Sequence, residues 1–154
     1  MAVARQVATN GHSSRDRFLR VSSGAGSTVE LEAQMANVSA ARRFVRNELE
    51  GRAPEEAVSD LMLATSELVT NAFEHGSSQP VRLTVRSGND EASITVVSGG
   101  EAGRVPEVES WTTAQADRIS GRGLGIVREL ADDIHVDRSN GNLAITVCRR
   151  FAEL

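Results

Sequence analysis

The sequence predicts an α+β fold, a two-layer sandwich in which helices cover one face of a mixed, mostly antiparallel sheet. Strand-like and helix-like segments follow one another without strict alternation, which is typical of this class. Two pairs of strands are separated by short turns and therefore predict antiparallel hairpins. The chain has 154 residues, enough for one domain with its own core and hardly enough for two.

The N-terminal part of the chain changes character at about residue 17. Residues 1–16 are polar, rich in small side chains and without periodicity, which predicts a disordered tail. A single domain is therefore expected over residues 17–154. It opens with a short strand at 18–22. After a Gly/Ser break, a second strand is expected at 28–33, where apolar and polar residues alternate.

Two helices follow these strands. The first is expected from Asn37 or Ser39, either of which can cap it, to about Leu49. The second opens at Pro54, because proline suits a first helical turn and the two glutamates after it suit the positive end of the helix dipole. It is expected to end just before Gly76, with this glycine in a left-handed conformation.

The rest of the chain has the period of strands, apart from one helix. Strands are expected at 81–85 and 92–97 around a turn at 88–90, and at 134–136 and 143–147 around a turn at 139–142. Between the two hairpins, residues 98–121 show no clear period. A connection of this length is usually functional or mobile. A short helix at 123–131 follows it.

Composition and charge exclude several classes of protein. Seventeen basic and twenty-one acidic residues give a net charge of -4 without a basic stripe, so direct binding to nucleic acid is not expected. No apolar run is long enough for a membrane span, and the N-terminus lacks the apolar region of a secretory signal. Cys148, the single cysteine, is expected to be a small core residue on a strand. Together these features predict a cytoplasmic protein.

The most informative segment places a carboxylate, an amide and an imidazole four residues apart on the second helix. Since a helix turns by about 100° per residue, four residues advance a side chain by only about 40°. Glu67, Asn71 and His75 therefore form one polar line. The line lies at the edge of the apolar stripe, where a carboxylate and an amide are suited to handling a proton and a metal ion. A solvated helix face is the alternative interpretation.

A second segment, Gly121-Arg122-Gly123-Leu124-Gly125, lies where the long connection meets the last helix. Glycines let the backbone approach a ligand closely, and the free N–H groups of a first helical turn attract anions, above all phosphate. Arg118 and Arg122 add positive charge. The other interpretation is that the glycines only allow the backbone to make a tight turn before the helix.

The combination of these elements resembles a known ATP-binding fold. A Glu-x-x-x-Asn helix, a hairpin, a glycine-containing loop, a Gly-x-Gly helix start and a second hairpin are shared by gyrase, MutL, a class of heat-shock chaperones and the sensor histidine kinases. The sequence of residues 66–72, Ser-Glu-Leu-Val-Thr-Asn-Ala, is most similar to the corresponding segment of the anti-sigma factor serine kinases of the RsbW and SpoIIAB type. The similarity covers residues 28–151.

The resemblance implies a role for each of these residues. Asn71 would bind Mg²⁺ through its side-chain oxygen, and Glu67 would act as general base on the attacking hydroxyl. The glycine segment would hold the ATP phosphates through its backbone, with one of the two nearby arginines at the γ-phosphate. His75 would lie near the nucleotide, or would be a histidine stabilised by the C-terminal end of the helix dipole.

Ser98 departs from the family pattern. After the strand at 92–97 the family usually has an aspartate that accepts a hydrogen bond from the adenine amino group, whereas here Ser98 is followed by Gly99 and Gly100. A hydroxyl still accepts one hydrogen bond but lacks the charge. The expected loss is about 1 kcal/mol, or several-fold to tenfold in affinity. Glu101 is a candidate substitute for the missing carboxylate.

Two functions from different classes follow. The first is an anti-sigma factor and serine kinase that uses ATP and Mg²⁺, binds a sigma factor and phosphorylates a STAS-type anti-anti-sigma protein. The resemblance also implies a homodimer. The second is a pseudo-kinase that binds ATP weakly or not at all and regulates a partner by sequestration. A detached catalytic domain of a sensor histidine kinase is a third interpretation, although the sequence offers no phospho-acceptor helix hairpin.

Overall fold

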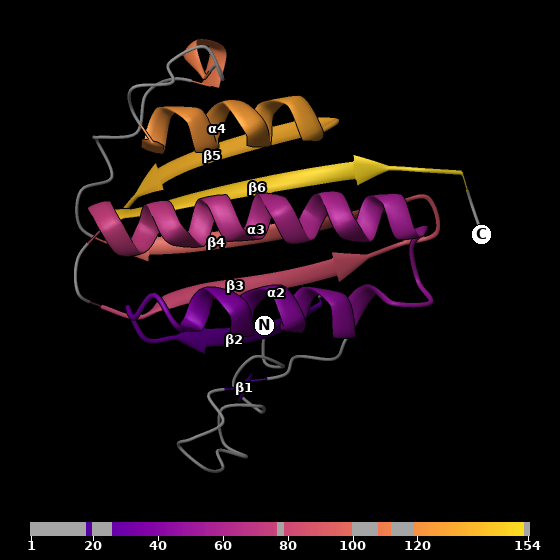
Figure 1. Ribbon diagram of the computed structural model, residues 1–154, viewed down its shortest axis with the longest axis horizontal. Coiled ribbons are helices and arrows are strands. Elements are labelled where there is room, and N and C mark those ends of the chain that lie inside the picture. Colours follow the sequence, from indigo (N-terminus) through magenta and orange to yellow (C-terminus); the bar gives the residue numbers. More distant parts are fainter. Residues whose placement is uncertain (1–17, 20–25, 77–78, 100–107, 112–118, 153–154) are drawn as a thin grey trace.

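A computed structural model describes residues 18–19, 26–76, 79–99, 108–111 and 119–152. The elements in chain order are β1 (Phe18–Leu19), β2 (Ser27–Leu31), α2 (Asn37–Leu49), α3 (Glu55–His75), β3 (Val81–Ser87), β4 (Glu91–Gly99), η2 (Val108–Ser110), α4 (Ile119–Leu130), β5 (Asp133–Ser139) and β6 (Asn142–Arg150). Figure 1 shows the long helix α3 running along the sheet between α2 and α4. The expected α+β class is confirmed, and the predicted tail at 1–16 lies outside the described residues.

The six strands form one sheet in the order β1-β2-β3-β4-β6-β5, in which every neighbouring pair is antiparallel. Both expected hairpins are present, as β3–β4 and β5–β6, and β4 pairs with β6 to join them. The β5–β6 turn contains Asn140 and Gly141, with φ values of 55° and 77°. Positive φ at both positions is the geometry that a two-residue hairpin turn favours.

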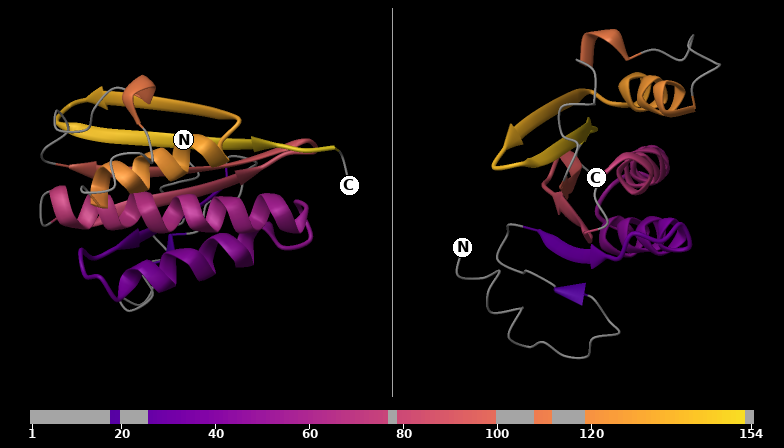
Figure 2. Two further views of the ribbon diagram at one scale, coloured as in Figure 1. Left: turned by 45° about the horizontal axis from the view of Figure 1, so that its top comes forward. Right: turned by 90° about the vertical axis from the view of Figure 1, so that its left-hand side faces the viewer.

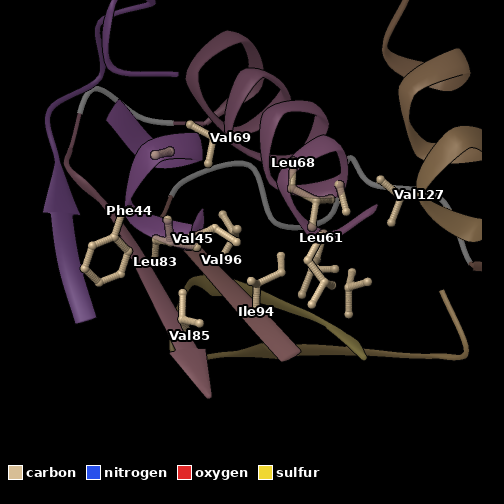
Figure 3. Packing of buried hydrophobic residues seen from close by; sticks show 14 of the residues in the cluster. Phe44, Val45, Leu61, Leu68, Val69, Leu83, Val85, Ile94, Val96 and Val127 are labelled. Carbon is tan, nitrogen blue, oxygen red and sulfur yellow. The ribbon is translucent and has the colours of Figure 1, made fainter. Parts of the chain in front are cut away.

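The helices α2, α3 and α4 lie on one face of this sheet (Figure 2). Strand residues that point toward the helices are buried, as in the run Val81, Leu83 and Val85 of β3. Figure 3 shows two of them, Leu83 and Val85, in the same buried cluster as Leu61 and Leu68 of α3. Burying a side chain of this size stabilises a fold by about 1.5–3 kcal/mol. The apolar stripe of α3 therefore fixes the rotation of the helix, and with it the direction of its polar line.

The ends of α2 and α3 differ in detail from the prediction. The residue before α2 is Ala36, which makes no side-chain cap, while the Asn37 amide donates to the Glu32 carbonyl at 2.8 Å. The expected side-chain cap is therefore wrong. Gly76 ends α3 with φ of -90° and ψ of -169°, which is extended and not left-handed. Glycine is required there by space, since a Cβ would lie 2.6 Å from the Ala72 carbonyl oxygen.

The last helix begins earlier than expected. α4 starts at Ile119, within the segment predicted as a loop, so all three glycines of the glycine segment lie inside the helix. Two buried residues of α4, Leu124 and Val127, are 2% and 0% exposed and join the core between α3 and α4. Their burial outweighs the low helix propensity of glycine, which costs about 1 kcal/mol per residue. The connection before α4 also contains η2, which was not expected.

The face of the sheet opposite the helices carries small and β-branched residues. Thr28 shares a hydrogen bond of 2.9 Å with Thr84, and Thr95 shares one of 2.8 Å with Thr146. Cys148 lies on this face and is only half-buried, so the strand was predicted correctly and the core position was wrong. Burial raises the pKa of its thiol to about 11, and Glu91 contributes to the rise. None of the described helices is long and apolar enough to cross a membrane.

Candidate nucleotide site

The polar line predicted on α3 divides into a sheltered part and an exposed part. Glu67 and Asn71 are half-buried, because Leu68 and Ala72 beside them are packed into the core. The side chain of His75 is 44% exposed at the end of the helix. Among the described residues, neither the Glu67 carboxylate nor the Asn71 amide forms a hydrogen bond or an ion pair.

The carboxyl group of Glu67 has an unusual environment. Burial raises its pKa above the ordinary value, and the negative charge of Glu74, seven residues later on the same helix, raises it further. Titratable groups with perturbed pKa values are frequent at functional sites, because an acid or base is most effective when its pKa approaches the working pH. Glu74 was not among the predicted site residues, although its spacing from Glu67 could have revealed it.

Gly123 of α4 lies directly against this carboxylate. A Cβ added to Gly123 would be 2.4 Å from Oε1 of Glu67 and 3.4 Å from its Cδ. Any other residue at this position would force the carboxylate to move. The structure thus brings together the two segments that the sequence singled out, the polar line of α3 and the glycine segment of α4.

The glycine segment lies inside α4, whereas the sequence predicted it at the start of the helix. Because α4 begins at Ile119, the free N–H groups of its first turn belong to residues 119–122, and Gly121 and Arg122 lie within that turn. Gly123 and Gly125 follow in the next turn. Leu124 is 2% exposed and part of the core, which leaves only its backbone for a ligand. Arg118 and Gly100 lie outside the described residues.

Ser98 is held near the C-terminal end of α3. It is 8% exposed and belongs to the buried alternation of β4, so its side chain is on the helix-covered face. A Cβ on Gly76 would lie 3.3 Å from the carbonyl oxygen of Gly99, which shows how closely the end of α3 approaches the end of β4. The role of Gly76 in this approach was missed, because a glycine after a helix usually indicates only a left-handed cap.

Comparison with known proteins agrees with this geometry. The sequence profile of the histidine kinase-like ATPase domain matches residues 31–149. The chain belongs to this family. The match contains Glu67, Asn71, Ser98 and the whole glycine segment, so the predicted membership of this ATPase superfamily is confirmed.

A solved structure shows the same fold. The RsbU and RsbW domains of Rv1364c from Mycobacterium tuberculosis align with a TM-score of 0.54 and 20% sequence identity over 82% of this chain. The aligned region is 34% of that protein, so this ATPase-family chain spans about a third of its length. A search of curated proteins gave no match.

Proposed function

We propose that the protein is an ATP- and Mg²⁺-dependent serine kinase that binds a sigma factor and phosphorylates a STAS-type anti-anti-sigma protein. The observation that carries the proposal is the contact between Gly123 and the half-buried Glu67 carboxylate, whose pKa is raised. A phosphoryl-transfer site needs a positioned base beside a backbone that can hold phosphates. The RsbW domain named in the similar structure supports the choice of this subfamily.

The residues present fit Mg²⁺ bound together with ATP. Among the described residues no group of three or more His, Cys, Asp or Glu side chains is placed to hold a metal ion. Mg²⁺ commonly takes only one or two protein ligands and the rest from water and phosphate. The side-chain oxygen of Asn71 suits such a ligand, and Mg²⁺ would neutralise phosphate charge there. The N–H groups of the first turn of α4 would hold phosphate oxygens.

Glu67 would accept the proton of the attacking serine hydroxyl. A positioned base typically contributes about 10²–10⁴-fold to the rate. The test is transfer of phosphate from Mg-ATP to a candidate STAS protein, followed by the same assay with Glu67→Gln. Loss of transfer in Glu67→Gln is expected, while Glu56→Gln at the exposed start of α3 provides the matched control. Undiminished transfer in Glu67→Gln, or none in the wild type, would refute the kinase.

Ser98 favours a second candidate, a pseudo-kinase that regulates its partner by sequestration. The buried hydroxyl offers the adenine amino group a neutral acceptor in place of a carboxylate. Calorimetry with Mg-ATP separates the two candidates, since micromolar binding supports the kinase and millimolar or absent binding supports the pseudo-kinase. Ser98→Asp is expected to tighten binding by several-fold to about tenfold. Ser93→Asp, on the same strand but the opposite face, is the control.

The homodimer that the family resemblance implies stays a prediction, which light scattering of the full chain can check.

A further inference from the structure

The single tryptophan of the chain is buried in an unexpected place. Trp111 is 3% exposed and belongs to the hydrophobic core, although it lies in the connection between β4 and α4. Its backbone N–H donates to the Val108 carbonyl at 3.0 Å, and Val108 itself packs against the core. The residues 108–111 are therefore attached to the folded body at an internal point of the connection.

An arginine of α4 holds the same segment from outside. Nη1 of Arg128 donates to the carbonyl oxygen of Glu109 at 2.6 Å and to that of Trp111 at 3.3 Å. In both views η2 lies beside α4, on the side away from α3 (Figures 1 and 2). Arg128 directly follows the buried Val127, so its stem starts from a fixed point of the core.

The chemistry suits a firm attachment. Hydrogen bonds from a cation are roughly twice as strong as neutral ones. A guanidinium presents several N–H donors in a rigid plane, whereas a lysine offers a compact charge on a flexible stem. Both acceptors are backbone carbonyl oxygens, one within the short 3₁₀ turn and one directly after it. Arg128 thus satisfies both and ties them to α4.

We propose that Arg128 is a positioning residue, which together with Trp111 fastens residues 108–111 to α4 and so fixes the middle of a connection whose two ends, at Ser98 and at the first turn of α4, belong to the proposed nucleotide site. The connection runs from the end of β4, beside Ser98, to the first turn of α4, and its anchor is on the C-terminal half of the same helix. The inference rests on the proposed function, because nucleotide is the ligand whose binding it would affect.

The test uses Trp111 as its own reporter, since the chain has one tryptophan and no tyrosine. Acrylamide quenching of the tryptophan emission is measured on the full chain without nucleotide, for the wild type, Arg128→Ala and Arg128→Lys. Quenching is expected to rise several-fold in Arg128→Ala and less in Arg128→Lys, which keeps the charge but not the planar fork. Arg42→Ala, an exposed arginine on α2, is the control and should leave the emission unchanged.

The second measurement is the affinity for Mg-ATP and its KM in the transfer assay. Arg128→Ala is expected to weaken nucleotide binding by about tenfold with kcat nearly unchanged. The far-UV spectrum must remain that of the wild type, and Arg128→Lys supplies the measurement if Arg128→Ala does not fold.

Each outcome decides a different part of the proposal. Unchanged quenching in Arg128→Ala would overturn the anchor. Raised quenching with unchanged nucleotide affinity would overturn the positioning role. If the wild type binds no nucleotide while quenching still rises in Arg128→Ala, the anchor stands, and the proposed function fails together with the positioning role.

Discussion

Glu67 is a carboxylate placed where water reaches it only in part. Because its pKa is raised in the folded chain by burial and by Glu74, the folded state holds the proton more readily than the unfolded state. The contribution of this group to stability is therefore fully present below its unfolded pKa and is lost as the pH rises through the folded pKa. At neutral pH the group destabilises the fold that contains it.

Replacing Glu67 by glutamine should stabilise the protein at neutral pH. We expect Glu67→Gln to melt at a higher temperature than the wild type at pH 7, and the difference to shrink as the pH falls and to disappear at about pH 3, where glutamate is protonated in both states. Thermal unfolding followed by circular dichroism across this range is the measurement. Glu74→Gln should give a smaller gain, and a Glu67→Gln protein that is less stable at pH 7 would contradict the assignment.

A methyl group at position 123 should separate activity from stability. The Cβ of Gly123→Ala would displace the flexible end of Glu67, while alanine favours the helix by about 1 kcal/mol. We therefore expect phosphate transfer to fall strongly with little change in the denaturant midpoint. Gly88→Ala is the control, because the nearest atom to its Cβ is 3.9 Å away. Equal activity of both variants would show that the position of the carboxylate is unimportant.

At the scale of the elements, α4 is held at its C-terminal end by an arginine of β6. Nη1 of Arg149 donates to Asp60 of α3 at 2.7 Å and to the Leu130 carbonyl at 3.0 Å, and its Nε lies 3.4 Å from Asp132. The side chains of Arg149 and Asp60 are 18% and 21% exposed, so the pair is sheltered from screening. One guanidinium thereby connects α3, α4 and β6.

Removing this connection should cost more than removing a surface pair. Arg149→Met keeps the apolar stem but leaves Asp60 without its cation, and we expect the free energy of unfolding to fall by about 1–3 kcal/mol. Arg46→Met, whose partner Glu55 is 68% exposed, should cost clearly less, because solvent screens this pair. Urea unfolding of both variants is the measurement, and equal losses would show that Arg149 acts as a surface residue.

The helices differ in how well their bounds can be predicted from the sequence. The long helix was predicted to within a residue at each end, because its apolar stripe, its acidic first turn and Gly76 agree. α4 starts four residues before its predicted start at residue 123, because glycines usually indicate a helix boundary. Their tolerance inside the helix depends on Leu124 and Val127 meeting α3, a contact between distant segments that local propensity does not contain.

In the candidate site, too, local features could be predicted from the sequence, while contacts between distant segments could not. The spacing of Glu67 and Asn71 could be read from the sequence, because it follows from helix geometry alone. The contact of Gly123 with Glu67, the effect of Glu74 and the anchoring of Trp111 depend on how α4 packs, so they became visible only in three dimensions. Residues far apart in the chain form the part of the site that the sequence could not predict.

At the scale of the whole molecule, a ligand that binds only the folded chain raises its stability. We expect Mg-ATP at a concentration of about 100 times its Kd to add about 2.7 kcal/mol to the free energy of unfolding. Thermal melting with and without Mg-ATP measures this, and EDTA should reverse most of the gain. Asn71→Ala should abolish the dependence on Mg²⁺, and a gain that EDTA does not change would argue against a metal ligand at this position.

The strand order also bears on how the chain folds. The pairing of β4 with β6 brings Ser98 beside Leu143, whereas the hairpins β3–β4 and β5–β6 close between neighbours in sequence. Contacts that are distant in sequence form slowly, because a long loop must close before they are made. We therefore expect the first half of the chain, with α2 and α3, to fold ahead of the hairpin that docks along β4. Glu67 comes from the early half and Gly123 from the late half, so on this order the candidate site forms only when the second half docks, and a chain arrested before that step would lack the contact between Gly123 and Glu67.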